Sequence, residues 1–318
     1  MKVVQLDRET LGYDIDTSVF KDFGEYESFD SDTIENNKEH IKDADVIIFN
    51  KSKMNEELLG EAKNVKFLAI TATGFDNIDL DYCRKRGIGA SNVKAYSTPA
   101  VAQHTFALAL YVLEKISYYD EYVKSGKYSS QSGFCNFDER YNELEGKTWG
   151  IIGMGNIGKS VAKIAEAFGC KVIFYSASGN STCTDYERVE FDELLARSDV
   201  LSIHCPLSDR TRGIINKEAL NKMKKSAILV NVARGPVIND ADLAEALENG
   251  VIAGAGLDVL SKEPMEADNP LGRIKDSRKL IITPHMAWAS VESRQRCCDE
   301  VYRNIEAFAK GESRNRLD

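Results

Sequence analysis

The stretch that decides the fold is Thr148-Trp149-Gly150-Ile151-Ile152-Gly153-Met154-Gly155-Asn156-Ile157-Gly158. Residues 148–152 form a short strand-like run, and the glycines that follow have the spacing G-x-G-x-x-G. Apolar residues then recur at helical spacing as far as Gly169, a residue type that suits the end of a helix. Because these glycines lie where a strand turns into a helix, they favour a dinucleotide-binding site over an ordinary glycine-rich turn.

Each glycine of this spacing has its own physical role. Gly153 permits the tight turn, Gly155 lets the backbone approach a pyrophosphate, and Gly158 lets the helix pack close to its strand. The pyrophosphate meets unpaired N–H groups at the positive end of the helix dipole, where Asn156 and Ile157 begin the helix. We therefore predict that these five residues bind a cofactor.

The totals describe an ordinary globular protein with more than one core. A length of 318 residues favours two domains. Hydrophobic residues make up 43% of the chain and charged residues 29%, values typical of a soluble protein. The net charge of −9 argues against binding to nucleic acid or to an anionic membrane. An anionic small molecule stays compatible with this charge, because a site can be locally positive.

The seven cysteines form no C-x-x-C pair, and most of them fall within apolar runs. This pattern predicts free thiols in a reducing compartment and, without Cys/His ligand spacing, no metal site. The N-terminus lacks the apolar core of a signal peptide, and no apolar run is long enough to span a bilayer. We expect a cytoplasmic protein.

Short apolar strands alternate with helical segments both before and after the glycine stretch. This alternation predicts an α/β fold with parallel sheets and helices on their faces. A helix from Pro99 to about Val123, capped by Thr98, would be ~37 Å long and could bridge two domains. Residues 125–142 are polar and are expected to form a connecting loop.

A second long helical pattern begins at Ser290 and ends at Gly311, and it could fold back onto the first unit. We therefore predict two Rossmann-like or flavodoxin-like domains with a cleft between them. The substrate domain is predicted to be discontinuous and to comprise residues 1–98 plus 290–318. The dinucleotide-binding domain is predicted to comprise residues 99–289.

Four polar residues are placed at or after the carboxyl ends of predicted strands, where open α/β sheets bind their ligands. Arg234 follows the strand 227–232, Asp258 lies near the end of the next strand, and Glu263 comes five residues later. His285 follows the last strand. Each residue alone has an ordinary explanation: a surface cation, a loop charge or a hydrogen-bonded core histidine. Their shared position beside a nucleotide loop favours a functional set.

The motifs that hold these residues resemble those of D-isomer-specific 2-hydroxyacid dehydrogenases. The resemblance covers nearly the whole chain, and Gln103 with the segment 286–290 is most similar to the glycerate dehydrogenase (hydroxypyruvate reductase) branch. The motifs are Val232-Ala233-Arg234-Gly235-Pro236, Gly256-Leu257-Asp258-Val259, Lys262-Glu263-Pro264, Thr283-Pro284-His285, residues 73–79 and residues 101–104.

The resemblance implies a role for each candidate residue. His285 would be the general acid in the reduction of a 2-oxo acid, and Glu263 would hydrogen-bond its other ring nitrogen. Arg234 would bind the substrate carboxylate and polarise the carbonyl, and the planar guanidinium suits this role better than an ammonium group does. Backbone N–H groups of Thr73 and Gly74 would hold the same carboxylate.

The resemblance also implies a nicotinamide cofactor, a 2-hydroxy acid or 2-oxo acid as small-molecule substrate, and a homodimer. Hydroxypyruvate or glyoxylate is the favoured substrate. Asp258 would orient the nicotinamide amide, with a purely structural role as the alternative. The remaining predicted cofactor contacts are Ser176, Cys205, Pro206, Val232 and Ala233.

One departure from the family concerns the cofactor. The family usually has Asp at the position of Ser176, where the carboxylate accepts from the ribose hydroxyls and repels a 2′-phosphate. Ser176 removes that repulsion, yet no Arg or Lys follows until Arg188. The sequence therefore predicts NAD and leaves NADP open.

A second class of function is compatible with the same scaffold. A dinucleotide-sensing interaction protein, similar to the corepressors that resemble these enzymes, would keep the fold, and the fold alone does not distinguish the two. The complete set of Arg234, Glu263 and His285 favours catalysis.

Overall fold

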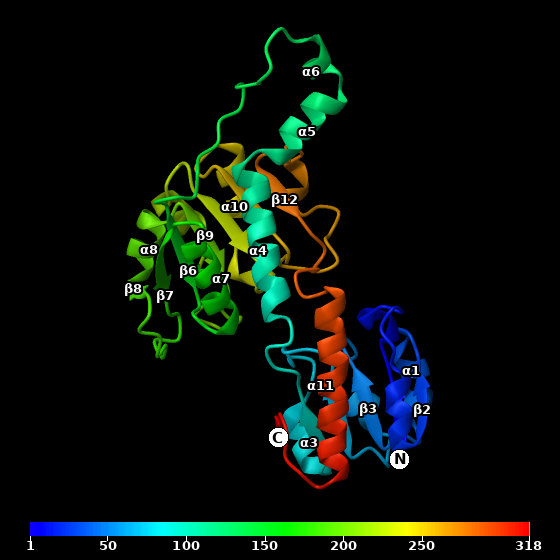
Figure 1. Ribbon diagram of the computed structural model, residues 1–318. Coiled ribbons are helices and arrows are strands. Elements are labelled where there is room, and N and C mark those ends of the chain that lie inside the picture. Colours follow the sequence, from blue (N-terminus) through cyan, green and yellow to red (C-terminus); the bar gives the residue numbers. More distant parts are fainter. Residues whose placement is uncertain (318) are drawn as a thin grey trace. The chain divides into compact units, whose positions relative to one another are not determined.

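A computed structural model describes residues 1–317 (Figure 1). The chain forms two compact units. Unit 1 consists of Met1–Ser97 together with the chain from Ala289 onward, and unit 2 consists of Thr98–Trp288. Within residues 1–317, none of the helices combines the length and the apolar character that crossing a membrane requires.

Unit 1 is built on a five-stranded parallel sheet with the order β2-β1-β3-β4-β5. Its central strands are buried on both faces, as expected for a parallel sheet that helices cover. The C-terminal helix belongs to this unit, because Phe308 stacks on Phe67 with ring centroids 4.4 Å apart. The strands are β1 Lys2–Gln5, β2 Glu25–Ser28, β3 Val46–Phe49, β4 Phe67–Ile70 and β5 Gly89–Ser91, and the helices are α1 Ile34–Ile41, α2 Glu56–Leu59, α3 Leu80–Arg86 and α11 Val291–Ala309.

Unit 2 is built on a seven-stranded parallel sheet with the order β12-β11-β10-β9-β6-β7-β8. The chain adds β7 and β8 on one side of β6, and then β9 to β12 on the other. The strands are β6 Thr148–Ile152, β7 Lys171–Tyr175, β8 Glu187–Arg188, β9 Val200–Ile203, β10 Ile228–Asn231, β11 Gly254–Leu257 and β12 Leu280–Ile282. The helices are α4 Thr98–Leu113, α5 Ile116–Lys124, α6 Lys127–Ser130, α7 Asn156–Ala167, α8 Phe191–Arg197, α9 Lys217–Lys222 and α10 Asp240–Glu248. The direction in which strands are added to the sheet thus reverses at β6, and open α/β sheets bind their ligands in the crevice at such a reversal.

Two hydrophobic clusters form the core of unit 2. Helices α4 and α7 contribute to one cluster, and α8, α9 and α10 contribute to the other. Trp149 of β6 is fully buried, stacks on Phe106 with centroids 4.4 Å apart, and donates its indole N–H to Ser202 Oγ at 2.9 Å. Together with unit 1, this architecture confirms the predicted α/β class with two parallel sheets.

The prediction of one continuous helix from Pro99 to Val123 is wrong. Helix α4 ends at Leu113, and α5 begins at Ile116 after Lys115, whose φ of 55° lies in the left-handed region. The break has a physical reason: α4 buries a row of apolar side chains, whereas α5 has no buried residue to hold it on the same core. The segment expected to be an irregular loop contains the short helix α6.

Two strands went unpredicted, and both are edge strands. β2 has the polar sequence Glu25-Tyr26-Glu27-Ser28, and β8 has only two residues, both exposed. An edge strand with polar, exposed side chains lacks the apolar run by which buried strands are recognised in a sequence.

Candidate active site

The glycine loop after β6 has the geometry that its spacing predicts. Gly153 has a φ of 97°, and a Cβ there would lie 2.8 Å from the backbone nitrogen of Cys205. At Gly158 a Cβ would lie 2.2 Å from the carbonyl oxygen of Gly153, so the helix packs as close as glycine allows. A Cβ on Gly155 would meet nothing within 4 Å, which leaves open space beside the backbone.

This open space lies at the start of α7, a helix of 12 residues. The first N–H groups of an α-helix have no partner within the helix and carry its positive partial charge. Open backbone at Gly155 together with these donors at Asn156 and Ile157 fits the pyrophosphate of a dinucleotide.

An imidazole and a carboxylate meet at the carboxyl edge of the same sheet. Nδ1 of His285 lies 2.7 Å from Oε2 of Glu263. The other oxygen of Glu263 accepts from the N–H of Leu260 at 3.0 Å, so this carboxylate is held on both sides. The two side chains are 32% and 35% exposed, respectively, and a dissolved substrate can reach them.

Asp258 anchors the segment that carries this imidazole. Its carboxylate is only 1% exposed and accepts from the N–H groups of Met286 and Ala287 at 2.8 Å each. The hydroxyl of Thr283 donates to it at 2.5 Å, and Nε2 of His104 lies 3.5 Å away. Burial acts to raise the pKa of Asp258, but these hydrogen bonds outweigh burial and leave the pKa lowered. These contacts attach the loop after β12 to the end of β11.

Arg234 lies at the same edge, directly after β10. The side chain of Asn231 fixes this turn, since it accepts from the N–H of Ala233 and donates to the carbonyl of Arg234, both at 3.0 Å. The guanidinium donates to the carbonyl of Ala233 at 2.8 Å and forms no ion pair within residues 1–317. It therefore keeps donors for an anionic ligand, and Asn231 is a supporting residue that the motif alone did not reveal.

The sheet brings some of the predicted residues together and leaves others apart. β10, β11 and β12 are neighbours, so Arg234, Asp258 and His285 follow adjacent strands. Glu263 and His285 are in direct contact, whereas Arg234 bonds to its own loop rather than to this pair. Thr73 and Gly74 belong to unit 1.

The carboxyl edge of the sheet in unit 1 has an anchor of its own. Asp7, 2% exposed and with a φ of 55°, accepts from the N–H groups of Asn50, Lys51 and Ser52 at 2.8–3.0 Å. The hydroxyl of Ser52 also donates to it at 2.9 Å, and the amide of Asn77 donates to the carbonyls of Asn50 and Ser52. The loop after β3 is thus locked by a residue that the sequence gave no reason to single out.

Thr73 and Gly74 lie in a second fixed loop of unit 1. The hydroxyl of Thr73 donates to the carbonyl of Val93 at 2.8 Å, and the amide of Asn92 donates to the carbonyl of Thr73 at 2.7 Å. Within residues 1–317, the backbone N–H groups of Thr73 and Gly74 donate to no other group. They are rigidly held donors of the kind predicted to bind a carboxylate.

The other predicted cofactor residues lie after strands that flank the glycine loop. Ser176 is buried after β7, and Cys205 is buried after β9. Burial raises the pKa of the Cys205 thiol to about 11, so this thiol is neutral near pH 7 and is no nucleophile. Pro206 is exposed beside it, and Val232 and Ala233 follow β10.

Two further histidines have structural contacts. His104 bonds through Nε2 to the hydroxyl of Thr283 at 2.9 Å. Nε2 of His204 lies 3.0 Å from Ser202 Oγ, whereas its Nδ1 is buried without a partner in the described chain. Burial lowers the pKa of His204 to about 3 and keeps it neutral. Residues 1–317 contain no cluster of His, Cys, Asp and Glu suited to a metal ion.

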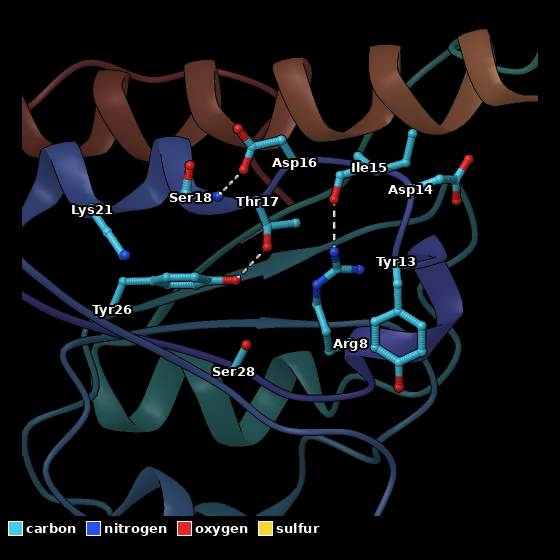
Figure 2. A pocket seen from close by; sticks show the side chains of 10 residues that line it. All are labelled: Arg8, Tyr13, Asp14, Ile15, Asp16, Thr17, Ser18, Lys21, Tyr26 and Ser28. Carbon is cyan, nitrogen blue, oxygen red and sulfur yellow. Dashed lines mark hydrogen bonds between the residues drawn. The ribbon is translucent and has the colours of Figure 1, made fainter.

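A polar hollow of about 530 Å³ in unit 1 is lined by the connection from β1 to β2 and by residues of β2 (Figure 2). Its guanidinium, from Arg8, donates to the carbonyls of Gly12 and Ile15. The hydroxyl of Tyr26 is shared between Gln5 and Thr17. These bonds hold the connection from β1 to β2 in its conformation.

A glycine loop that fits a pyrophosphate and a histidine–carboxylate pair at one edge of the same sheet define a dinucleotide-dependent dehydrogenase. Residues 106–287 match the family described as D-isomer specific 2-hydroxyacid dehydrogenase, NAD binding domain. The chain belongs to the D-isomer specific 2-hydroxyacid dehydrogenase family.

Two similar proteins are named as a hydroxypyruvate reductase and a glycerate dehydrogenase, the branch that the sequence resembles. A hydroxypyruvate reductase of Blautia hydrogenotrophica is 40% identical over 98% of each chain. A glycerate dehydrogenase of Methylorubrum extorquens is 38% identical over 99% of this chain and 98% of its own. Among solved structures, an acyclic imino acid reductase in complex with NADPH and D-Arg has a TM-score of 0.88 and 31% identity over the full length of both chains. The protein is an oxidoreductase that transfers hydride between a nicotinamide cofactor and a 2-hydroxy acid/2-oxo acid pair.

Proposed function

We propose that the physiological substrate pair is hydroxypyruvate and D-glycerate, with glyoxylate as a smaller second substrate. The observation that carries the catalytic part of this proposal is the 2.7 Å contact between His285 and Glu263. The similarity to a hydroxypyruvate reductase and a glycerate dehydrogenase supports the choice of substrate.

The proton donor is His285. A bound nicotinamide dinucleotide supplies the hydride, so the protein must provide the proton for the carbonyl oxygen. Because Nδ1 faces Glu263, Nε2 is the ring nitrogen left to give that proton. The carboxylate stabilises the protonated ring and fixes its orientation.

Arg234 is the residue proposed to bind the substrate carboxylate and polarise its carbonyl. Its guanidinium has no ion-pair partner in the described chain, and its backbone is fixed by Asn231. The unpaired N–H groups of Thr73 and Gly74 are the backbone donors proposed for the same carboxylate.

Steady-state assays of hydroxypyruvate, glyoxylate, pyruvate and larger 2-oxo acids with NADH and with NADPH test the proposal. Hydroxypyruvate should give the highest kcat/KM, and His285→Gln should lower kcat by about 10²–10⁴-fold. Dinucleotide binding without turnover of any 2-oxo acid would support the sensing alternative, which the similar proteins do not favour.

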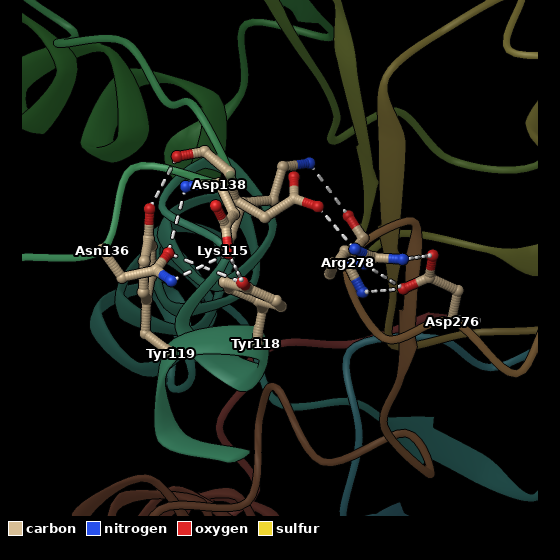
Figure 3. Close-up of polar contacts among 8 residues, drawn as sticks. Lys115, Tyr118, Tyr119, Asn136, Asp138, Asp276 and Arg278 are labelled. Carbon is tan, nitrogen blue, oxygen red and sulfur yellow. Dashed lines mark hydrogen bonds and ion pairs between the residues drawn. The ribbon is translucent and has the colours of Figure 1, made fainter. Parts of the chain in front are cut away.

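The arm of unit 2 is the proposed contact with a second copy of the chain. It comprises α5, α6 and the loop up to residue 142, and Figure 1 shows it projecting from the sheet of unit 2. A polar network fixes its base (Figure 3): Arg278 forms a bidentate pair with Asp276 at 2.8 Å and reaches Glu139 at 2.5 Å. Lys115 donates to the carbonyl of Arg278, so both ends of the arm are attached to the loop before β12.

The segment of the arm that follows α6 exposes two large aromatic side chains. Phe134 is 87% exposed and Phe137 is 82% exposed. Exposed aromatic rings close together in the sequence, on a segment whose ends are held by hydrogen bonds, are typical of an interface. The resemblance to the family implies a homodimer. The double variant Phe134→Ser, Phe137→Ser should convert a dimer into a monomer in analytical ultracentrifugation, whereas Val19→Ser, an exposed apolar position in unit 1, should leave the dimer intact.

The cytoplasm is the proposed location. All seven cysteines are free, which suits a reducing compartment. Labelling of thiols in unfractionated cells, followed by mass spectrometry, should find them reduced.

A further inference from the structure

The turn that follows β7 is the part of the dinucleotide site where Ser176 stands in place of the Asp that is usual in the family. The turn comprises residues 176–180, is closed by a hydrogen bond from the N–H of Gly179 to the carbonyl of Ser176 at 3.0 Å, and has no acidic residue. Ser176 is buried at its start, and Ser178 is exposed at its middle. The turn therefore offers hydroxyl groups where the family usually offers a carboxylate.

Two arginines reach this turn from different parts of the sequence. Nη1 of Arg188, from the edge strand β8, lies 3.1 Å from the carbonyl of Gly179. Nη1 of Arg210, from the loop after β9, lies 3.5 Å from the carbonyl of Ser178. The sequence alone did not predict this contact, because Arg210 lies 32 residues beyond Ser178.

Strand order explains how the loop after β9 comes to meet the turn after β7. β7 and β9 are the two neighbours of β6, so the segments after them lie on either side of the glycine loop. In this arrangement the adenosine ribose lies beyond the strand that follows the glycine loop and its helix. Arg210 therefore reaches the turn beside which that ribose would bind.

The charges of these two arginines are not neutralised within the described chain. Neither Arg188 nor Arg210 forms an ion pair in residues 1–317. Arg197, which lies nearby in the sequence, differs: it binds Glu187 through two nitrogens at 2.8 Å and also Glu193 at 2.6 Å. Guanidinium groups without an ion pair, beside hydroxyls that can donate, are suited to a phosphate dianion, and no carboxylate in the turn opposes it.

We propose that the turn 176–180, with Arg188 and Arg210, binds the 2′-phosphate of NADP(H), so that the enzyme prefers NADP(H) to NAD(H). This inference rests on the dinucleotide site of the proposed function. It names a ligand group and does not depend on which 2-oxo acid is reduced.

Binding of cofactor fragments tests the inference without any turnover. Isothermal titration calorimetry with adenosine 2′,5′-bisphosphate and with adenosine 5′-monophosphate isolates the contribution of the 2′-phosphate. The bisphosphate should bind more tightly to the wild-type protein. Arg210→Ala should weaken the bisphosphate by about tenfold or more and leave the monophosphate nearly unchanged.

Two further variants serve, respectively, as a control and as a second test. Arg197→Ala removes a paired arginine of the same region and should leave the ratio of the two affinities unchanged. Ser176→Asp restores a carboxylate, and it should lower the affinity for NADPH while NADH binds as well as before or better. Thermal melts in the presence of each dinucleotide report the same preference.

Equal binding of the two fragments to the wild-type protein, or an unchanged affinity ratio in both Arg210→Ala and Ser176→Asp, would overturn the inference. Failure of the proposed function gives a different result, namely tight binding of NADPH and of the bisphosphate with no reduction of any 2-oxo acid.

Discussion

The two sheets of this enzyme use the same device at their carboxyl edges. In unit 1, buried Asp7 follows β1 and binds three consecutive N–H groups in the loop after β3. In unit 2, buried Asp258 follows β11 and binds two consecutive N–H groups in the loop after β12. Each carboxylate provides acceptors for backbone donors that would otherwise lack partners, and so it fixes a loop that belongs to another strand.

The two anchors differ in what surrounds them. The side chains that bond to Asp7 are the hydroxyls of Ser31 and Ser52. Asp258 also meets the imidazole of His104, and the loop that it holds carries His285. The comparison teaches that Asp7 fixes a loop without a proposed catalytic residue, whereas Asp258 fixes the loop that carries the proposed proton donor, His285.

Replacing Asp258 should have the largest effect. Asp258→Asn keeps the shape but removes the charge, and one amide cannot accept from all of the present donors. We expect the free energy of unfolding to fall by about 3 kcal/mol and kcat to fall with it. Urea denaturation and steady-state kinetics measure the two effects. A variant of wild-type stability and activity would show that this carboxylate is no anchor.

The matched change in unit 1 should be milder. Asp7→Asn should lower the free energy of unfolding by about 2 kcal/mol, because it weakens charge-assisted bonds without disturbing a histidine. We expect kcat to fall less than in Asp258→Asn, because the loop that Asp7 holds carries none of the proposed catalytic residues. An equal loss of kcat in both Asp→Asn variants would remove the distinction between the two anchors.

As the pH falls, unit 2 should lose stability first through His204 and then through Asp258. The pKa of His204 is lowered to about 3, so the unfolded chain takes up a proton below about 6.5 that the folded chain refuses. Stability should therefore fall from about pH 6.5 towards pH 3, by at most about 1.4 kcal/mol per pH unit. The pKa of Asp258 is also lowered, so its contribution is present above its ordinary pKa near 4 and is lost as the pH falls through the lowered value.

The variant His204→Asn separates these two groups. It should flatten the stability profile between pH 6.5 and about 4 and leave the steeper loss at lower pH. Chemical denaturation at a series of pH values measures both slopes. Parallel profiles of variant and wild type would mean that His204 does not contribute.

The comparison also explains how far the sequence could be interpreted. The glycine loop was predictable because its spacing, between a strand and a helix, carries the chemistry. The Glu263–His285 pair was predictable from the resemblance to the family. Asp7 and Asn231 were not, because each acts through the backbone of a loop that only the folded chain brings near. Arg210 escaped prediction for the same reason, and the break at Lys115 depends on which helix finds a core to cover.

The rate of hydroxypyruvate reduction by Glu263→Gln tests most directly the claim that His285, held by Glu263, donates the proton. Because the ring then loses the carboxylate that fixes its orientation, kcat should fall by about 10²-fold, whereas the affinity for the dinucleotide, measured by calorimetry, should stay unchanged. A Glu263→Gln variant with wild-type kcat would contradict the account.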